Sequence, residues 1–192
     1  MLADIIIIGR KIKLRKKTIT DARDDYAWHN DPELARIDAA PRLTLPFIQY
    51  LSIYADELYR ESPVRYEFAI DTPDDKHIGN CIYYGIDMFR GETELGIVIG
   101  NRDYWNEGYG TDAVTILVTH IFRQVDFKRI YLKTLVSNSR AQKCFQKCGF
   151  SPYGRRNRDG HSFVLMEMYR KQWEEKHPSL EATVGINDSN AN

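Results

Sequence analysis

The sequence predicts an α/β protein, because strand-like and helix-like segments alternate through its second half around a glycine-rich loop. Residues 94–99 are an apolar run of strand length that begins with Glu94. Residues 104–113 follow, with the sequence Tyr-Trp-Asn-Glu-Gly-Tyr-Gly-Thr-Asp-Ala. The next apolar side chains recur at the spacing of one helix face, at Val114, Leu117, Val118, Ile121 and Phe122. A strand, a loop with two glycines and a helix therefore come in direct succession.

Shorter patterns predict the elements before this loop. The predicted strands are residues 5–8 and 11–15, which form an opening hairpin, and residues 66–71 and 77–84, which are joined by a turn. The predicted helices are residues 21–29, a second helix that begins at Asp31-Pro32-Glu33, and residues 46–60.

The alternation continues after the loop helix. Residues 129–136 are rich in β-forming side chains, and Asn138 is suited to N-cap a second helix that Gly149 ends. Residues 162–169 are predicted as a further strand and residues 171–176 as a short helix. We expect residues 1–176 to form a single domain and residues 177–192, where the apolar periodicity stops, to be a flexible tail.

The loop has the properties of a phosphate-binding turn. Gly108 and Gly110 leave backbone N–H groups without a shielding Cβ, and the following helix directs its positive dipole end to the same place. An ordinary strand-to-helix turn also carries glycine. A P-loop is excluded, because no Gly-Lys-Ser/Thr follows. The loop lacks the third glycine of a dinucleotide-binding fingerprint, although the looser form of that fingerprint allows alanine, as at Ala113. The acidic residue that should end a strand about 20 residues later is also missing, which argues against a dinucleotide site.

The loop and the downstream helix together resemble the GNAT (Gcn5-related) N-acetyltransferases. That family's loop carries Gln or Arg, two variable residues, Gly, one residue, then Gly or Ala. Residues 105–110 match this pattern, except that Trp105 stands where Gln or Arg is usual. The Asn-helix-Gly-Phe pattern of the family is matched by Asn138-Ser139-Arg140-Ala141, Phe145 and Gly149-Phe150.

The N-terminal segment is similar to the RimJ/RimL branch of that family, which acetylates protein N-termini. The similarity lies in Leu14-Arg15, Asp21 and residues 29–33, His-Asn-Asp-Pro-Glu. The whole resemblance covers residues 10–173.

The resemblance implies a GNAT fold, a central mixed, mostly antiparallel twisted sheet of about seven strands flanked by helices. It implies acetyl-CoA as co-substrate, with its pantetheine arm and thioester oxygen held by the backbone near Val98 and Ile99. An acidic residue on the same strand, here Glu94, is the implied catalytic base. The cofactor-binding residues that we expect are Ile97, Val98, Ile99, Glu107, Gly108, Tyr109, Gly110, Thr111, Asn138, Ala141, Lys143 and Phe145.

Acetyl transfer to an amine sets its own chemical demands. A lysine-like amine costs about 4.6 kcal/mol to deprotonate at pH 7, whereas an α-amine of pKa near 8 costs about 1.4 kcal/mol. Strand alternation places Glu94 on the same face as Gly96 and Val98, where a carboxylate can remove that proton directly or through water. The alternative is a solvated charge paired with a neighbouring Lys or Arg, and Glu92 is the second choice of base.

The leaving thiolate has no evident proton donor. Several family members place a tyrosine where this chain has Phe145, which carries no transferable proton. Water can reprotonate the thiolate, so a dedicated general acid is not required. Asn138 can cap its helix and also reach the pantetheine amide, or act as a cap alone.

Three classes of function remain open. The first is acetylation of a protein or peptide N-terminus. The second is acetylation of a small-molecule amine, such as a polyamine, an amino acid or an aminoglycoside. Such a cationic substrate calls for an acidic groove, to which Asp24, Asp25, Asp31, Glu33 and Asp38 are candidate contributors. The third is a non-catalytic CoA-binding module, which Phe145 keeps open.

The amino-acid composition limits the kinds of partner and the location that we expect. The chain has 27 basic and 27 acidic residues, so no net field draws it toward nucleic acid or an anionic membrane. The Cys144 and Cys148 pair has no further ligand nearby, so we expect packing rather than a metal site. Three cysteines and the lack of a long apolar run favour a reduced, cytoplasmic location. Residues 1–8 and the tail are candidate contacts for a homodimer.

Overall fold

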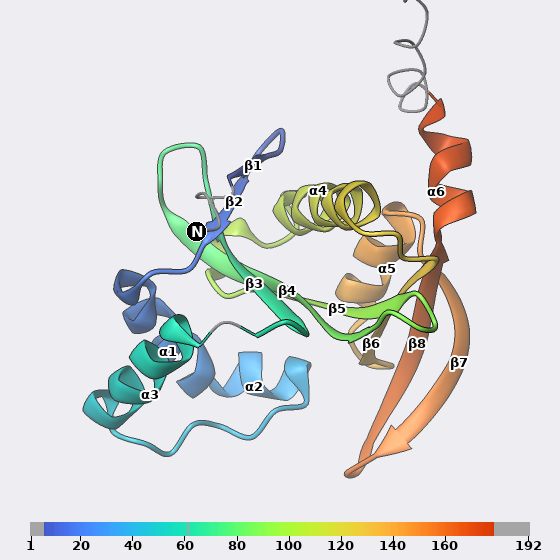
Figure 1. Cartoon of the computed structure of the whole chain (residues 1–192). Helices are drawn as coiled ribbons and strands as arrows, with labels where there is room; N and C mark the ends of the chain where they lie inside the picture. Colours follow the sequence, from blue (N-terminus) through green and yellow to red (C-terminus); the bar gives the residue numbers. More distant parts are fainter. Residues whose placement is uncertain (1–5, 61, 179–192) are drawn as a thin grey trace, which may run out of the picture.

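Eight strands form one sheet in the computed structural model, which describes residues 6–60 and 62–178 (Figure 1). The strands are β1 (Ile7–Ile8), β2 (Lys13–Lys16), β3 (Arg65–Asp71), β4 (His77–Asp87), β5 (Glu92–Ile99), β6 (Arg129–Leu135), β7 (Ser151–Arg158) and β8 (His161–Tyr169). Their order is β1-β2-β3-β4-β5-β6-β8-β7, and every neighbouring pair is antiparallel except β5 and β6. The sheet is therefore mixed and mostly antiparallel, with eight strands rather than about seven.

The parallel pair β5–β6 is short. Its register joins only Glu92 to Arg129, Thr93 to Ile130 and Glu94 to Tyr131. Beyond Glu94 the two strands diverge, whereas β5 stays paired with β4 as far as Ile99 and β6 stays paired with β8 as far as Leu135. The sheet thus opens in its middle, directly before the glycine loop.

Helices cover both faces of the sheet. They are α1 (Ala22–Asn30), α2 (Pro32–Asp38), α3 (Phe47–Tyr59), α4 (Tyr109–Gln124), α5 (Ser139–Lys147) and α6 (Arg170–Lys176), with short 3-10 turns at η1 (Ile19–Asp21) and η2 (Arg102–Tyr104). In Figure 1, α4 lies above the sheet and α1, α2 and α3 lie below it. The main core forms where the apolar face of α4, with Val114, Leu117 and Ile121, meets sheet residues such as Ile70 and Ile130.

Local chemistry explains where two helices begin. The Asp31 side chain accepts from the N–H groups of Glu33 and Leu34, and the Asn138 side chain accepts from that of Ala141. These bonds satisfy N–H groups that have no partner within a helix, which is why Asp and Asn are favoured N-caps. Gly149 follows α5 at a φ of +100°, the left-handed conformation that ends many helices.

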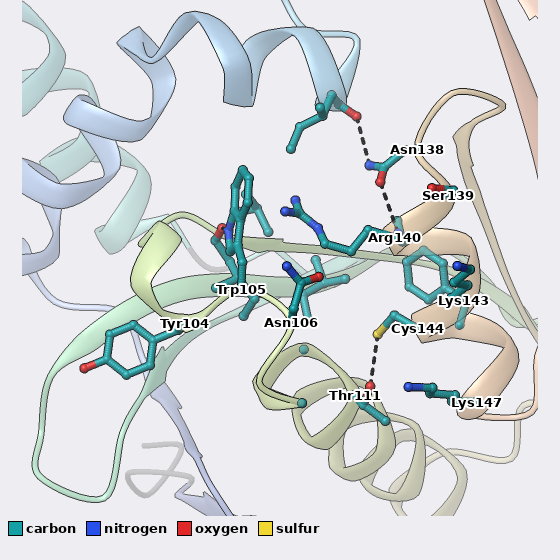
Figure 2. A pocket seen from close by; sticks show the side chains of 18 of the residues that line it. Tyr104, Trp105, Asn106, Thr111, Asn138, Ser139, Arg140, Lys143, Cys144 and Lys147 are labelled. Atoms are coloured by element: carbon teal, nitrogen blue, oxygen red, sulfur yellow. Dashed lines mark hydrogen bonds between the residues drawn. The ribbon is translucent and has the colours of Figure 1, made fainter.

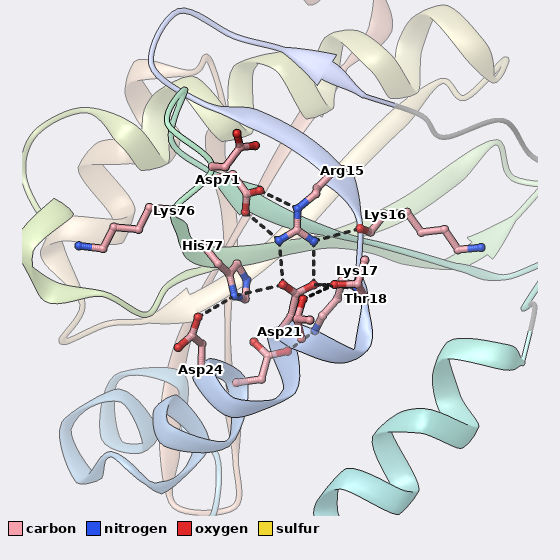
Figure 3. Close-up of polar contacts among 12 residues, drawn as sticks. Arg15, Lys16, Lys17, Thr18, Asp21, Asp24, Asp71, Lys76 and His77 are labelled. Carbon is pink, nitrogen blue, oxygen red and sulfur yellow. Dashed lines mark hydrogen bonds and ion pairs between the residues drawn. The ribbon is translucent and has the colours of Figure 1, made fainter.

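A buried ionic network fixes the start of α1 to the sheet (Figure 3). Arg15 on β2 donates to both oxygens of Asp21, with both distances 2.7 Å, and to both oxygens of Asp71, at 2.6 and 3.1 Å. Asp21 and Asp71 are 3% and 1% exposed, so neither is solvated by bulk water. His77 on β4 adds a contact of its Nδ1 to Asp24, at 3.3 Å. The network therefore holds the start of α1 against the sheet.

The elements predicted from the sequence are confirmed with small shifts at their ends, except that β7 was missed. Its eight residues are almost entirely exposed, and it pairs only with β8 at the margin of the sheet. Residues 1–5 and most of the predicted tail, residues 179–192, lie outside the described residues. The proposed dimer contacts at those ends therefore remain predictions.

Candidate active site

A cavity of about 500 Å³ lies between the loop after β5 and helix α5 (Figure 2). One wall comes from the diverging end of β5 and from the loop, and the other comes from α5. The end of α2 closes it with Ile37 and Asp38. The full lining is Ile37, Asp38, Ile97, Val98, Ile99, Tyr104, Trp105, Asn106, Gly108, Gly110, Thr111, Asn138, Ser139, Arg140, Ala141, Lys143, Cys144, Phe145 and Lys147.

Hydrogen bonds hold the glycine loop in place. The Trp105 indole N–H donates to the carbonyl of Ile99 at 2.6 Å, and the Lys11 ammonium donates to the carbonyl of Glu107 at 2.7 Å. The Asp112 carboxylate accepts from the backbone N–H of Lys11 at 2.7 Å. Gly108 N-caps α4 with a φ of +86°, a conformation that favours glycine. The N–H groups of the first turn of α4, at the cavity wall, therefore have no intrahelical partner and meet a fixed loop.

The charge of the cavity lining is positive. Three of its side chains are cationic, Arg140, Lys143 and Lys147, and one is acidic, Asp38. Burial raises the pKa of Asp38, which favours the uncharged form of its carboxyl group. Lysine and arginine side chains facing the amino end of a helix make a site suited to phosphate groups.

Arg140 lies over the indole ring of Trp105. The centre of its guanidinium group is 3.4 Å from the centroid of the indole ring, and burial lowers the pKa of Arg140. Stacking on an aromatic face holds a guanidinium while leaving its N–H groups free at the edges. A cation carried by α5 thus lies beside position 105, where the related loop usually has Gln or Arg.

A second cavity of about 140 Å³ adjoins the first where β5 and β6 diverge. Both cavities are lined by Ile37, Asp38, Ile97, Asn138, Ala141 and Phe145. The smaller cavity also contains Tyr84, Glu94 and Lys133. The two cavities therefore meet at Phe145, with the cationic wall on one side and Glu94 on the other.

Glu94 is paired with a lysine. Its Oε1 lies 2.6 Å from the Nζ of Lys133, and its side chain is 15% exposed. The Tyr84 hydroxyl lies 3.5 Å from the same Nζ. Burial, and to a smaller extent a hydrogen bond to Glu94, raises the pKa of Tyr84. Glu92, the second choice of base, pairs with Arg129 at 2.8 Å and lines neither cavity. Of the two carboxylates, only Glu94 faces a space that can hold a substrate.

Most of the predicted site residues come together. The cavity lining contains ten of the predicted cofactor residues: Ile97, Val98, Ile99, Gly108, Gly110, Thr111, Asn138, Ala141, Lys143 and Phe145. Glu107 and Tyr109 are not among the lining residues. The Lys11 ammonium lies over the ring of Tyr109, 5.2 Å from its centroid. The Asn138 amide both caps α5 and donates to the carbonyl of Ile37 at 3.4 Å, so it links α5 to α2.

The sequence interpretation missed part of the lining. No sequence pattern near Ile37 and Asp38 indicated that they line the larger cavity, because α2, which is distant in the sequence, brings them to it. Cys144 was expected to pack inward as an apolar residue, but it lies in the cavity wall. Lys143 was expected from the sequence, but Lys147 was not. The spacing of Arg140, Lys143 and Lys147, which places them on one side of a helix, is the signal that could have indicated the cationic wall.

A sheet that opens beside a cationic cavity at the amino end of a helix agrees with the transferase class that the sequence resemblance implies, and the comparisons show that class. A family model described as "Acetyltransferase (GNAT) domain" matches residues 11–151, so the chain belongs to the GNAT acetyltransferases and is an N-acetyltransferase by family. A protein described as "Uncharacterized N-acetyltransferase p20" from Bacillus licheniformis is 25% identical over 145 residues, 75% of this chain and 81% of the relative.

Solved structures share the fold. A spermidine N-acetyltransferase from Vibrio cholerae, in complex with CoA and spermine, aligns with a TM-score of 0.74 at 16% identity, over 85% of this chain and 98% of that one. The aminoglycoside acetyltransferase AAC(6')-Ib, in complex with coenzyme A, aligns with a TM-score of 0.71 at 21% identity, over 86% and 99%. At these identities the likeness shows the fold.

No helix among the described residues is both long and apolar enough to span a membrane. Within the same part of the chain, no group of three or more His, Cys, Asp or Glu side chains is placed to hold a metal ion.

Proposed function

We propose that this protein transfers the acetyl group of acetyl-CoA directly to an α-amine, such as a peptide or protein N-terminus, in a ternary complex. The observation that carries the proposal is the pair of adjoining cavities at the divergence of β5 and β6. One has a cationic wall facing the amino end of α4, and the other contains Glu94. A donor and an acceptor can thus approach one point from opposite sides.

The larger cavity is the proposed site of the cofactor. The diphosphate is expected at the free N–H groups of residues 108–111, with Arg140, Lys143 and Lys147 supplying positive charge. The pantetheine arm lies along the unpaired side of β5, at Ile97, Val98 and Ile99, and pairs with it as another strand would. A backbone N–H of this segment donates to the thioester oxygen as negative charge develops there.

Glu94 is the proposed proton acceptor. It lies at the last residue pair before the strands separate, so its carboxylate is next to the point where an amine would meet the thioester. The amine loses its proton to Glu94, directly or through water, and its nitrogen attacks the carbonyl carbon. The carbon–sulfur bond then breaks, and the thiolate takes a proton from water.

The pairing of Glu94 with Lys133 favours an acceptor that loses its proton easily. A carboxylate paired with a lysine makes the site less negative, so the site attracts a polycation less strongly than an unpaired carboxylate would. An α-amine needs only about 1.4 kcal/mol for deprotonation at pH 7, against about 4.6 kcal/mol for a lysine-like amine. The site is therefore better matched to an α-amine, as in the RimJ/RimL branch.

The acidic groove expected for a polycationic substrate is largely taken up by internal pairs. Asp25 is buried and lies 2.6 Å from the Lys17 ammonium, and Asp31 and Glu33 both pair with Arg102. Asp38 is the member of that set that lines the cavities. A small-molecule amine held by Asp38 is thus the second candidate, and the fold shared with the spermidine and aminoglycoside enzymes supports it.

The test is an acceptor panel with mass-spectrometric detection of acetylated products. Peptides with free N-termini, amino acids, polyamines and aminoglycosides are each incubated with acetyl-CoA. We expect peptides to be acetylated at the α-amine with the highest kcat/KM. Preferential acetylation of a polyamine or an aminoglycoside would refute the α-amine assignment and support the second candidate. Binding of acetyl-CoA without any product would support a non-catalytic module.

Glu94→Gln tests the catalytic assignment. We expect kcat to fall by about 10²–10⁴-fold at neutral pH, with acetyl-CoA affinity retained. Glu92→Gln is a matched control, because it makes the same change two residues earlier on β5, outside both cavities. Equal losses in the two variants would show that Glu94 acts through the stability of β5 and not as a base.

A further inference from the structure

The wall of the larger cavity contains a thiol. Cys144 on α5 lines the cavity, and its Sγ is within hydrogen-bond distance of the Thr111 hydroxyl on α4, at 3.5 Å (Figure 2). A Cβ added to Gly110 would lie 3.7 Å from this sulfur, so the thiol directly faces the glycine loop. The side chain is partly exposed, in contrast with Cys81, which is 1% exposed in the core.

The surroundings of Cys144 favour its thiolate form. The neighbouring thiol of Cys148, one helical turn later, lowers the pKa of Cys144 against the opposing effect of burial, and the Thr111 hydroxyl and the charges of Lys147 and Arg140 act in the same direction. The same interaction, together with burial, raises the pKa of Cys148, so that thiol keeps its proton. Burial raises the pKa of Cys81. One of the three thiols is therefore both accessible and activated.

We propose that Cys144 is a modification site within the cofactor cavity, which takes a small anionic disulfide by thiol–disulfide exchange and thereby excludes the cofactor. The Cys144 thiolate attacks one sulfur of the disulfide, a new sulfur–sulfur bond forms and the original one breaks. The other half of the reagent leaves as a thiolate. Cys144 is oxidised, the disulfide is reduced, and an added thiol reverses the reaction.

The adduct forms with a small molecule and not with Cys148. Residues four apart on a helix have Cβ atoms about 5–6 Å apart, whereas a disulfide needs about 3.5–4.5 Å. A bond between the two cysteines would require the last turn of α5 to unwind. Cys148 is instead a positioning residue, held by contacts of its sulfur with the Thr111 carbonyl at 3.5 Å and the Thr115 hydroxyl at 3.7 Å.

The charge of the wall selects the reagent. Arg140, Lys143 and Lys147 lie on the same helix and line the same cavity, so they attract a disulfide that carries carboxylates or phosphates and repel a cationic one. An adduct on Cys144 would project toward Gly110 and Thr111, where the proposed function places the diphosphate. The exclusion step rests on that proposed function.

The experiment measures the reaction of each thiol with 5,5'-dithiobis(2-nitrobenzoate), an anionic aromatic disulfide, followed by the released thionitrobenzoate. We expect one fast thiol in the native protein, assigned to Cys144 by peptide mass spectrometry, and its loss in Cys144→Ser. Raising the salt concentration should slow this phase, and should speed the reaction with cystamine, a cationic disulfide. Cys148→Ala should slow the fast phase, because it removes the neighbouring thiol that lowers the pKa of Cys144 and so reduces the thiolate fraction.

Protection of Cys144 by bound acetyl-CoA tests this inference separately from the proposed function. Saturating acetyl-CoA, which has no free thiol, should slow the fast phase at least tenfold, and the adduct should bind no acetyl-CoA by calorimetry until dithiothreitol removes it. A fast phase that persists in Cys144→Ser would refute the inference, as would an adduct that binds acetyl-CoA normally. If the unmodified protein gives no heat with acetyl-CoA, the proposed function itself fails, whatever the reactivity of Cys144.

Discussion

Replacing Arg15 by methionine is expected to destabilise the fold severely. The side chain makes paired hydrogen bonds to Asp21 and Asp71, which are 3% and 1% exposed. Methionine has a similar length and no charge, so the variant leaves two carboxylates buried without their cation. Breaking a buried pair in this way costs about 3–5 kcal/mol. For a chain of this length, Tm should fall by about 6–20 °C.

The loss should depend on pH. Burial alone would raise the pKa of Asp21, but hydrogen bonds from Arg15 and from the Thr18 N–H, with the charge of His77, outweigh it and lower the pKa below 3.8. A carboxyl group whose pKa is lowered in the folded state stabilises the fold at any pH above its unfolded-state pKa. This stabilisation is lost as the pH falls through the lowered, folded-state pKa. The difference between the wild type and Arg15→Met should therefore be largest near neutral pH and shrink in acid.

Urea denaturation of both proteins between pH 7 and pH 3 measures this difference, and Arg158→Met is the matched control. Arg158 pairs with Asp159, but the two side chains are 65% and 81% exposed. A surface pair of this kind contributes about 0–1 kcal/mol. If Arg15→Met costs no more than Arg158→Met, or if its cost is the same at both ends of the pH range, the reasoning about the buried network is refuted.

Three further changes have defined outcomes. Gly108→Ala adds a side chain at a φ of +86° with no atom within 4 Å, so we expect a backbone cost of about 1–2 kcal/mol by urea denaturation, and weaker acetyl-CoA binding. Arg140→Ala should weaken the affinity for acetyl-CoA about tenfold and reduce the dependence of that affinity on salt. Calorimetry at two salt concentrations measures both quantities, and an unchanged salt dependence would contradict the prediction. Arg170→Met removes donors to the carbonyls of Phe122, Val125 and Phe127, at 2.6–2.7 Å, and should lower stability by about 3 kcal/mol; a loss below about 1 kcal/mol would show that water replaces them.

The elements that the sequence predicts are those whose conformation is set by their own residues. The α4 helix follows from one apolar face, and α5 follows from its cap at Asn138 and its end at Gly149. β7 has no such cause, because its Arg-rich, exposed segment is a strand only through pairing with β8. Its conformation is set by the neighbouring strand and not by its own side chains.

The site divides in the same way. The glycine loop and the acidic residue on β5 could be found from spacing, and the cavities lie beside both. The contacts in and around the candidate site join distant segments: Lys133 to Glu94, Arg140 to Trp105, and Arg102 to Asp31. An acidic stretch in the sequence therefore looked like a groove, although Asp25 pairs with Lys17, and Asp31 and Glu33 share the distant Arg102.

The divergence of β5 and β6 also bears on how the molecule avoids self-association. A strand with one unpaired side is normally a template for another chain, and proteins shield such edges with charge, bulges or covering segments. Here the bare backbone beyond Glu94 faces an interior passage whose opposite side is formed by α5 and the end of α2. A β-strand of another chain would have to displace α5 and the end of α2 to pair with this side of β5. These two helices are therefore expected to protect the exposed strand edge from edge-to-edge association.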